Sequence, residues 1–291
     1  MNKNLLKGLL YSGSASFWWG ILGVIYFEYL SFVGAAELVV HRTVWTTAIL
    51  LFTTIYFSKW NLFITIMRKK KKLFFLFLSG LLIFINWSVW IYAVVTNRII
   101  DASFGYYIFP IFSILFGYIF FKEKLNMMRI ISIFLVLSSI VFLLFSFRNI
   151  PWIGLAVALS WSTYNLIRKK INVDTDIGLF IESLFITPIA LLLFYFLFKN
   201  NDTYFITSGI SLSLILLLAG PMTVIPLFLY VRGVTLSGLG PTGMVFFITP
   251  TCQFLLGFFY YNEPFSTDKL ISFIFIWIAV VVYLRDLMNK Q

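Results

Sequence analysis

Residues 109–124 read "FPIFSILFGYIFFKEK", and residues 249–264 read "TPTCQFLLGFFYYNEP". A shift of 140 positions aligns a proline, a glycine and a glutamate in these stretches: Pro110 with Pro250, Gly117 with Gly257, and Glu123 with Glu263. The same shift aligns Gly80 with Gly220 and Lys59 with Lys199. One register that persists over several apolar segments predicts an internal repeat. The alternative is that glycine and proline recur by chance, as they do in many membrane helices.

The composition places this repeat in a membrane. Hydrophobic residues make up 61% of the 291 residues and charged residues 11%, with a mean hydropathy of +0.96. Soluble domains contain roughly 45–50% apolar and about 25% charged residues. The first apolar stretch follows a basic start but is longer than the roughly 7–15 residues of a signal-peptide core. We therefore expect it to be a retained membrane helix.

Charged, Gly, Pro and Asn residues divide the chain into ten apolar runs, each close to the 17–25 residues that span a bilayer. They are residues 5–27, 36–58, 73–96, 102–121, 130–147, 151–167, 177–198, 209–231, 239–261 and 269–285. Most of the 22 lysines and arginines fall in the segments on one side, including the run "RKKKK" at 68–72. By the positive-inside rule, both termini are predicted to be cytoplasmic. The run is thus a topology signal, and we expect no nucleic-acid partner.

The predicted fold is an all-α integral membrane protein with ten transmembrane helices in two five-helix repeats, residues 1–148 and 149–291. Because each half contains an odd number of helices, the second half enters the membrane with opposite polarity. Inverted repeats are typical of secondary transporters, whose solute site lies near the midplane between the halves.

Four ionisable residues lie inside predicted spans: Glu37, His41 and Arg42 in "ELVVHRTVWT" (37–46), and Glu182. Such groups cost about 2.5–3.5 kcal/mol each at a bilayer centre and commonly mark a transport pathway. Glu37, His41 and Trp45 are four residues apart, so they are predicted to share one helix face. Arg42 points about 100° away from that face, and the 140-residue shift aligns it with Glu182. We therefore expect an Arg42–Glu182 pair.

Each of these residues also has a simpler interpretation. Glu37 lies near a helix end and could reach water, and His41 could be a neutral packing residue rather than one that titrates near its usual pKa of about 6.5. An Arg42–Glu182 pair could be purely structural. We expect the four residues to serve substrate binding or coupling.

A second group of residues is expected to line a cavity: Trp19, Asn86, Trp90, Tyr106, Pro110 and Pro250. Mid-span aromatic rings suit planar or cationic solutes, whereas aromatic residues at span ends often form interface belts. The two prolines, with Pro221 and Pro226, are expected to interrupt helices and to hinge, with packing as the alternative. The small residues "SGSAS" at 12–16 favour close helix packing.

Several motifs in chain order resemble one known family. They include "FWWG" (17–20), "DASFGYYIFP" (101–110), "GLFIESLFITP" (178–188) and "YNEPFSTDK" (261–269). The chain resembles the RarD-type branch of the EamA, or drug/metabolite transporter, superfamily. That resemblance implies ten helices in inverted repeats and a permease for a small organic solute in the bacterial cytoplasmic (inner) membrane. Two departures concern the presumed cavity: Phe109 precedes Pro110 where relatives have asparagine, and Val95 and Thr96 replace polar residues.

The function expected is a secondary active transporter of a drug or metabolite that works by alternating access. Its partners are a small-molecule solute, membrane lipid and, as a hypothesis, protons; both a monomer and a homodimer fit. No Walker loop is present, and one histidine with one cysteine cannot build the usual zinc or catalytic sites. We therefore expect no cofactor, no metal and no enzyme activity. The alternatives are an uptake carrier for a metabolite such as S-adenosylmethionine or an amino acid, and an intramembrane enzyme or lipid-handling protein.

Overall fold

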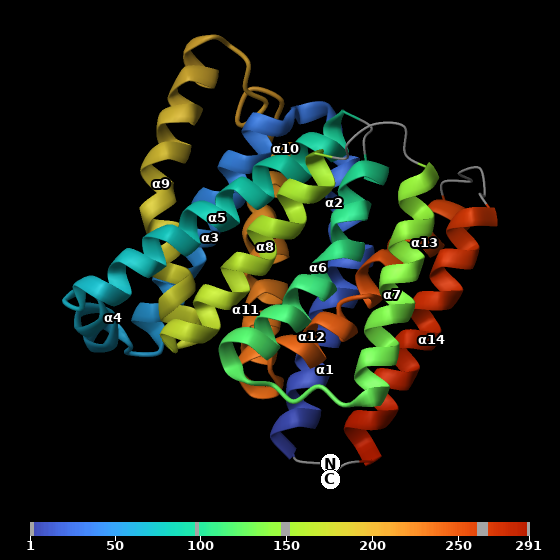
Figure 1. Cartoon of the computed structure of the whole chain (residues 1–291). Coiled ribbons are helices and arrows are strands. Elements are labelled where there is room, and N and C mark those ends of the chain that lie inside the picture. Colours follow the sequence, from blue (N-terminus) through green and yellow to red (C-terminus); the bar gives the residue numbers. More distant parts are fainter. Residues whose placement is uncertain (1–2, 97–98, 147–151, 261–266, 290–291) are drawn as a thin grey trace.

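The structure is a computed structural model that describes residues 3–96, 99–146, 152–260 and 267–289. Within these ranges every regular element is helical (Figure 1). The elements are α1 Lys3–Trp18, a π-helical turn Trp19–Gly23, α2 Val24–Tyr29, a 3-10 turn Ser31–Val33, α3 Ala35–Tyr56, α4 Trp60–Met67, α5 Lys70–Val95, α6 Ile99–Phe121, α7 Met127–Ser146, α8 Trp152–Ile171, α9 Thr175–Lys199, α10 Ile210–Leu217, α11 Ala219–Ser237, α12 Leu239–Val245, α13 Ile248–Phe259 and α14 Thr267–Asn289.

Five helical segments in the described ranges are long and apolar enough to cross a membrane: Lys3–Tyr29, Ala35–Tyr56, Lys70–Val95, Thr175–Lys199 and Ile210–Ser237. The other predicted runs also coincide with helices, two of which are shorter apolar stretches, Gly105–Phe121 and Met127–Phe142. A multi-pass, all-helical membrane protein is therefore confirmed, and the count of ten spans stays a prediction.

The helices pack as long antiparallel or crossing pairs around a buried centre (Figure 1). α3 packs along α9, α1 along α11, α5 along α8, and α7 along α14, while α6 contacts both α8 and α12. Glu37, in the first turn of α3, bonds to the segment that follows α9, whereas Lys59, just after α3, contacts Asp174 and Asp176 at the start of α9. α3 and α9 therefore run antiparallel.

Small residues bring α1 onto α11, as the "SGSAS" pattern predicted. A Cβ on Gly8 would lie 2.8 Å from the Cβ of Ser237, and one on Gly233 would lie 2.9 Å from the Gly8 carbonyl oxygen. Ser12 is fully buried in the same contact. Close approach of this kind replaces hydrophobic burial as the main stabilising contact between helices in a membrane.

Proline determines where the segment 239–259 is broken. Pro250 has no N–H for the carbonyl oxygen of Phe246, so the i→i−4 ladder is interrupted there. The Phe246 oxygen accepts from Thr249 N at 2.9 Å instead, and Phe246 and Phe247 form the turn between α12 and α13. The helix interruption expected near Pro221 is also present, as a turn at Leu218. In contrast, α6 continues through Pro110 and α11 continues through Pro226, so the interruptions expected at these two prolines are absent.

One helix was not predicted. The predicted spans 36–58 and 73–96 leave residues 59–72 as a connection, but residues 60–67 form α4. Its Phe63 and Ile66 are buried, and the Phe63 ring lies 5.1 Å from that of Phe180 on α9. The helix was missed because it is a single short amphipathic segment beside a strong run of positive charge.

Candidate functional site

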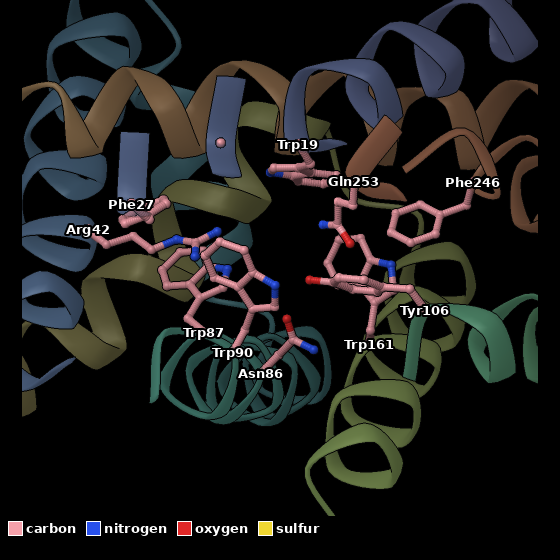
Figure 2. Close-up of a pocket in the computed structure, with 11 residues that line it drawn as sticks. Trp19, Phe27, Arg42, Asn86, Trp87, Trp90, Tyr106, Trp161, Phe246 and Gln253 are labelled. Carbon is pink, nitrogen blue, oxygen red and sulfur yellow. The ribbon is translucent and has the colours of Figure 1, made fainter. Parts of the chain in front are cut away.

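A small buried pocket lies where segments from the two halves of the sequence meet (Figure 2). Its volume is about 40 Å³, which is room for a few water molecules at roughly 10–15 Å³ each. Its lining comes from the π-helical turn, α2, α3, α5, α6, α8, the α12–α13 turn and α13. The lining residues are Trp19, Gly23, Phe27, Arg42, Asn86, Trp87, Trp90, Tyr106, Trp161, Phe246 and Gln253.

Arg42 supplies the only formally charged side chain among these lining residues. It is 5% exposed, and its guanidinium carbon lies 4.7 Å from the Trp87 ring centroid, 5.1 Å from Phe27 and 5.9 Å from Trp90. Figure 2 shows the guanidinium beside Trp87 and Trp90, with Trp19 and Gln253 across the open space. Cation–π contact of this kind partly offsets the loss of hydration.

Aromatic rings form the opposite wall of the pocket. Trp19 meets Trp161 edge-on at 5.4 Å, and Tyr106 meets Phe246 edge-on at 5.5 Å. Tyr106 and Phe246 are 140 positions apart, and each lies four residues before a proline, Pro110 or Pro250. The carbonyl that each proline leaves without its usual amide partner therefore belongs to a residue of the pocket wall.

Two amides complete the lining. The Asn86 side-chain nitrogen donates to the Val157 carbonyl oxygen at 3.0 Å and to Ser160 Oγ at 3.1 Å, which ties α5 to α8. Its side-chain oxygen is turned towards the middle of the pocket (Figure 2). The pocket also contains a buried acceptor, Gln253 Oε1, that lacks a hydrogen-bond partner.

The predicted stripe of Glu37, His41 and Trp45 is confirmed as a hydrogen-bonded ladder along α3. The indole N–H of Trp45 donates to His41 Nδ1 at 3.0 Å, and His41 Nε2 lies 3.5 Å from Glu37 Oε1. An indole nitrogen can only donate, so His41 Nδ1 is the acceptor and the imidazole is neutral with its proton on Nε2.

Glu37 does not reach water, although it lies in the first turn of its helix. Its side chain is 1% exposed, and its carboxylate accepts from the backbone N–H groups of Tyr204 and Phe205 at 2.8–3.0 Å and from Thr203 Oγ1 at 2.8 Å. The carboxylate therefore fixes the segment after α9 against the start of α3.

Glu182 lies in a separate buried cluster between α5, α8 and α9. Its carboxylate is 3.5 Å from Arg168 Nη1 and accepts from Ser79 Oγ at 2.5 Å and from the Tyr164 hydroxyl at 3.2 Å. Arg168 fits because Gly178 has no side chain: a Cβ there would lie 1.8 Å from Arg168 Nη1. The Tyr164 ring stacks on Trp161 at 5.3 Å, which connects the cluster to the pocket wall.

The predicted Arg42–Glu182 pair is wrong, because Glu182 pairs with Arg168 and Arg42 lies among aromatic rings. The antiparallel crossing of α3 and α9 explains the error. Thr47 and Thr187, also 140 positions apart, hydrogen-bond to each other at 2.7 Å where the two helices cross. Arg42 and Glu182 each lie five residues before that point, so they diverge by about 7.5 Å in opposite directions at 1.5 Å per residue.

The structure thus separates the predicted site residues into groups. Arg42, Trp19, Asn86, Trp90 and Tyr106 share the pocket. The remaining residues are not among its lining. Glu37 and His41 form the ladder, and Glu182 lies in the cluster with Arg168. Pro110 and Pro250 each follow a wall residue by four positions in the sequence.

Sequence reasoning missed Gln253, Phe246 and Arg168. Gln253 is a lone amide in an apolar run, which is a usable signal, whereas Arg168 begins the basic stretch "RKK" at 168–170 and lies just after the predicted span 151–167. Trp161, Tyr164 and Arg168 are separated by three and four positions, which predicts that the three side chains share one helix face. Within the described residues, no group of three or more His, Cys, Asp or Glu side chains could hold a metal ion.

Comparison with known proteins identifies the family to which the chain belongs. Residues 6–145 match the EamA-like transporter family. Protein RarD of Salmonella typhi is 32% identical over 99% of this chain and 98% of its own length. The uncharacterized transporter YojE of Bacillus subtilis is 33% identical over 95% of this chain and 93% of its own length.

A solved crystal structure shares the fold, with a TM-score of 0.69 at 15% identity, over 98% of this chain and 99% of the other. The relatives' names indicate a membrane transporter rather than an enzyme. With its aromatic pocket between helices that cross a membrane, this chain belongs to the EamA-like transporter family, in the RarD-type branch.

Proposed function

We propose that the protein is a secondary active transporter that moves a small organic solute across the bacterial cytoplasmic membrane by alternating access. The observation that carries the proposal is the pocket around Arg42, a buried cation without a carboxylate partner among the described residues. Polar groups inside membrane proteins are costly and commonly mark a solute or ion pathway. A pocket lined by both halves of the chain is also where transporters with inverted repeats bind their solutes.

The proposal includes ten membrane segments in two inverted halves, residues 1–148 and 149–291. Contacts between positions 140 residues apart support it: Thr47 meets Thr187, and Tyr106 meets Phe246. Pairs of helix contacts also match, since α5 packs on α8 as α11 packs on α1. The distribution of lysine and arginine supports a cytoplasmic location for both termini. Glu263, the repeat equivalent of Glu123, lies outside the described residues.

Glycines at equivalent positions support the same symmetry. A Cβ on Gly80 of α5 would lie 3.0 Å from the Glu182 carbonyl oxygen of α9. A Cβ on Gly220 of α11 would lie 2.9 Å from the Trp45 Cβ of α3. Each glycine therefore allows close approach between helices that are equivalent under the repeat.

Broken helices beside the pocket supply the movable parts that alternating access needs. The π-helical turn provides Trp19 and Gly23, and the α12–α13 turn provides Phe246. A π-helical turn and a proline-interrupted helix are both places where few backbone hydrogen bonds must change for a helix to bend. Bending at these two turns is proposed to open the pocket to one side and close it to the other.

Proton coupling through Glu182 is proposed as the driving step. The carboxylate is buried, has a charge partner in Arg168, and is connected through Tyr164 and Trp161 to the pocket. Protonation of Glu182 would remove its attraction to Arg168 and allow that contact to rearrange during the cycle. Glu37 is a weaker candidate, because its carboxylate already accepts hydrogen bonds from the backbone N–H groups of Tyr204 and Phe205.

The test is uptake of a radiolabelled solute panel into proteoliposomes with and without an imposed pH gradient. Wild type is expected to show saturable flux that the gradient accelerates, and Glu182→Gln is expected to lose the acceleration. Asp202→Asn, at an exposed carboxylate after α9, is the matched control and should behave as wild type. Flux that ignores the gradient would contradict coupling, and the absence of flux for every solute would contradict transport.

A further inference from the structure

Hydrogen-bond donors exceed acceptors among the unused buried atoms of the pocket residues. Arg42 Nε and the indole nitrogens of Trp19 and Trp161 are buried without a hydrogen-bond partner. Gln253 Oε1 is the unpartnered buried acceptor in the same set. Because guanidinium and indole nitrogens donate and never accept, a ligand that satisfies them supplies acceptor atoms.

Arg42 also differs from three other cations of low exposure in the described part of the chain. Arg168 has Glu182, Arg129 has Asp286, and Lys169 has Glu123 as an anionic partner. The ionisable groups that act on Arg42 are the phenols of Tyr26 and Tyr106, which are neutral near pH 7. A buried charge without a counter-charge is costly, so an anion that enters the pocket gains an interaction that water does not already provide.

Resting on the proposed transport function, we propose that the solute is a carboxylate whose charged group binds the Arg42 guanidinium. The Trp87 and Phe27 rings contact the guanidinium and limit how it can turn, while its N–H edge remains available for bidentate pairing with a carboxylate. One positive charge matches one carboxylate better than a doubly charged phosphate. The remaining aromatic wall, with Trp19, Trp161 and Tyr106, suits a flat apolar body on the same molecule.

This assignment revises the expectation of a cationic solute that the aromatic residues alone suggested. An aromatic cage attracts a cation when no other charge is present. Here the rings already contact the cation Arg42, so a second positive charge in a pocket of about 40 Å³ would be repelled. The pocket as it stands admits a carboxylate group, and the apolar body requires the wall to open.

The test measures binding by isothermal titration calorimetry with the full chain in lipid nanodiscs. Three ligands of nearly the same shape are compared: phenylacetate, phenylacetamide and phenethylamine. Phenylacetate is expected to bind at least about tenfold more tightly than the other two, as charge-assisted bidentate bonds are stronger than neutral ones. Equal or tighter binding of the amide or the amine, or no binding of phenylacetate, would overturn the proposal.

Variants assign the effect to Arg42. Arg42→Gln should weaken phenylacetate binding by at least about tenfold and leave phenylacetamide binding unchanged. Arg42→Lys should retain part of the preference for phenylacetate, because lysine keeps the positive charge but lacks the bidentate guanidinium group. Arg232→Gln, at an exposed arginine of α11, removes the same charge and should have no effect. Unchanged phenylacetate affinity in Arg42→Gln would overturn the proposal. If that variant does not fold, the Arg42→Lys variant and the comparison of the three ligands on the wild-type protein still test the proposal.

Inorganic phosphate is a separate arm of the titration. Phosphate binding that displaces phenylacetate with higher affinity would overturn the assignment to a carboxylate. Failure of the proposed transport function has a different readout, which is the absence of flux for every solute in proteoliposomes. That result does not depend on which ligand charge is preferred in nanodiscs.

Discussion

At the scale of residues, three ionisable side chains within six positions of α3 have three different environments. Glu37 accepts hydrogen bonds from the backbone after α9, His41 is a neutral link to Trp45, and Arg42 faces the pocket. Spacing predicted the Glu37–His41 stripe because i and i+4 positions always share a helix face. The partners of Arg42 and Glu182 could not be predicted, because they depend on where two helices cross.

The carboxylate of Glu37 is expected to be structural. In Glu37→Gln, an amide N–H₂ replaces one oxygen beside the N–H groups of Tyr204 and Phe205, which leaves buried donors unpaired at a cost of about 1–3 kcal/mol each. We expect a clear fall in thermal unfolding temperature in detergent. His41→Gln, which loses one long contact of 3.5 Å and the bond from Trp45, should fall less. A larger loss in His41→Gln would contradict this view of Glu37.

The Arg168–Glu182 pair is expected to be strongly coupled. Removing one member of a buried ion pair typically costs about 3–5 kcal/mol, whereas removing both is often close to neutral. Arg168→Gln and Glu182→Gln should each destabilise the protein more than the double variant does. The measurement is a double-mutant cycle of unfolding free energies in mixed micelles. Additive losses would show that the 3.5 Å contact contributes little.

At the scale of elements, the two symmetric prolines act differently. The repeat predicted a helix interruption at each proline. Because the two residues are chemically identical, the sequence could not show that only one of them breaks its helix. α6 is continuous through Pro110, whereas α12 ends at Val245 and α13 begins at Ile248. Contacts with other helices act on the broken segment: Ser113 Oγ donates to the Leu239 carbonyl oxygen at 2.7 Å, which joins α12 to α6.

Pro250→Ala is expected to restore an amide donor for the Phe246 carbonyl oxygen and to favour a continuous helix. Phe246 would then be drawn away from Tyr106, so solute flux should fall while the unfolding temperature does not. Pro110→Ala is the symmetric comparison and should change flux less, because its helix is already continuous. The reverse order of effects in a proteoliposome assay would contradict the assigned role of the α12–α13 turn.

At the scale of the whole molecule, two contacts join positions that the 140-residue shift aligns: Thr47 with Thr187, and Tyr106 with Phe246. The two-fold relation between the halves that we propose would bring such positions together. Membrane character and the helical class followed from composition. The pocket could not be predicted in the same way, because its lining comes from eight separate elements, whose relative positions depend on packing.

A disulfide can test the crossing of α3 and α9. In a Cys252→Ser background, Thr47→Cys with Thr187→Cys should crosslink under mild oxidation, because the two hydroxyls are 2.7 Å apart. Thr43→Cys with Ser183→Cys, one turn earlier on both helices, should not, since antiparallel divergence separates these positions by about 12 Å along the helix axes. Gel mobility after oxidation reports both results. Crosslinking of the second pair alone would place the crossing elsewhere.

The central claim, that the Arg42 pocket opens to each side of the membrane in turn, is tested most directly by accessibility. A single cysteine replaces Phe27 of the lining in the Cys252→Ser background, and an impermeant maleimide is added to either side of sealed vesicles. A cysteine at exposed Ser58 is the control and should react from one side only. We predict that the Phe27→Cys variant reacts from both sides; reaction from one side only under every condition would contradict alternating access.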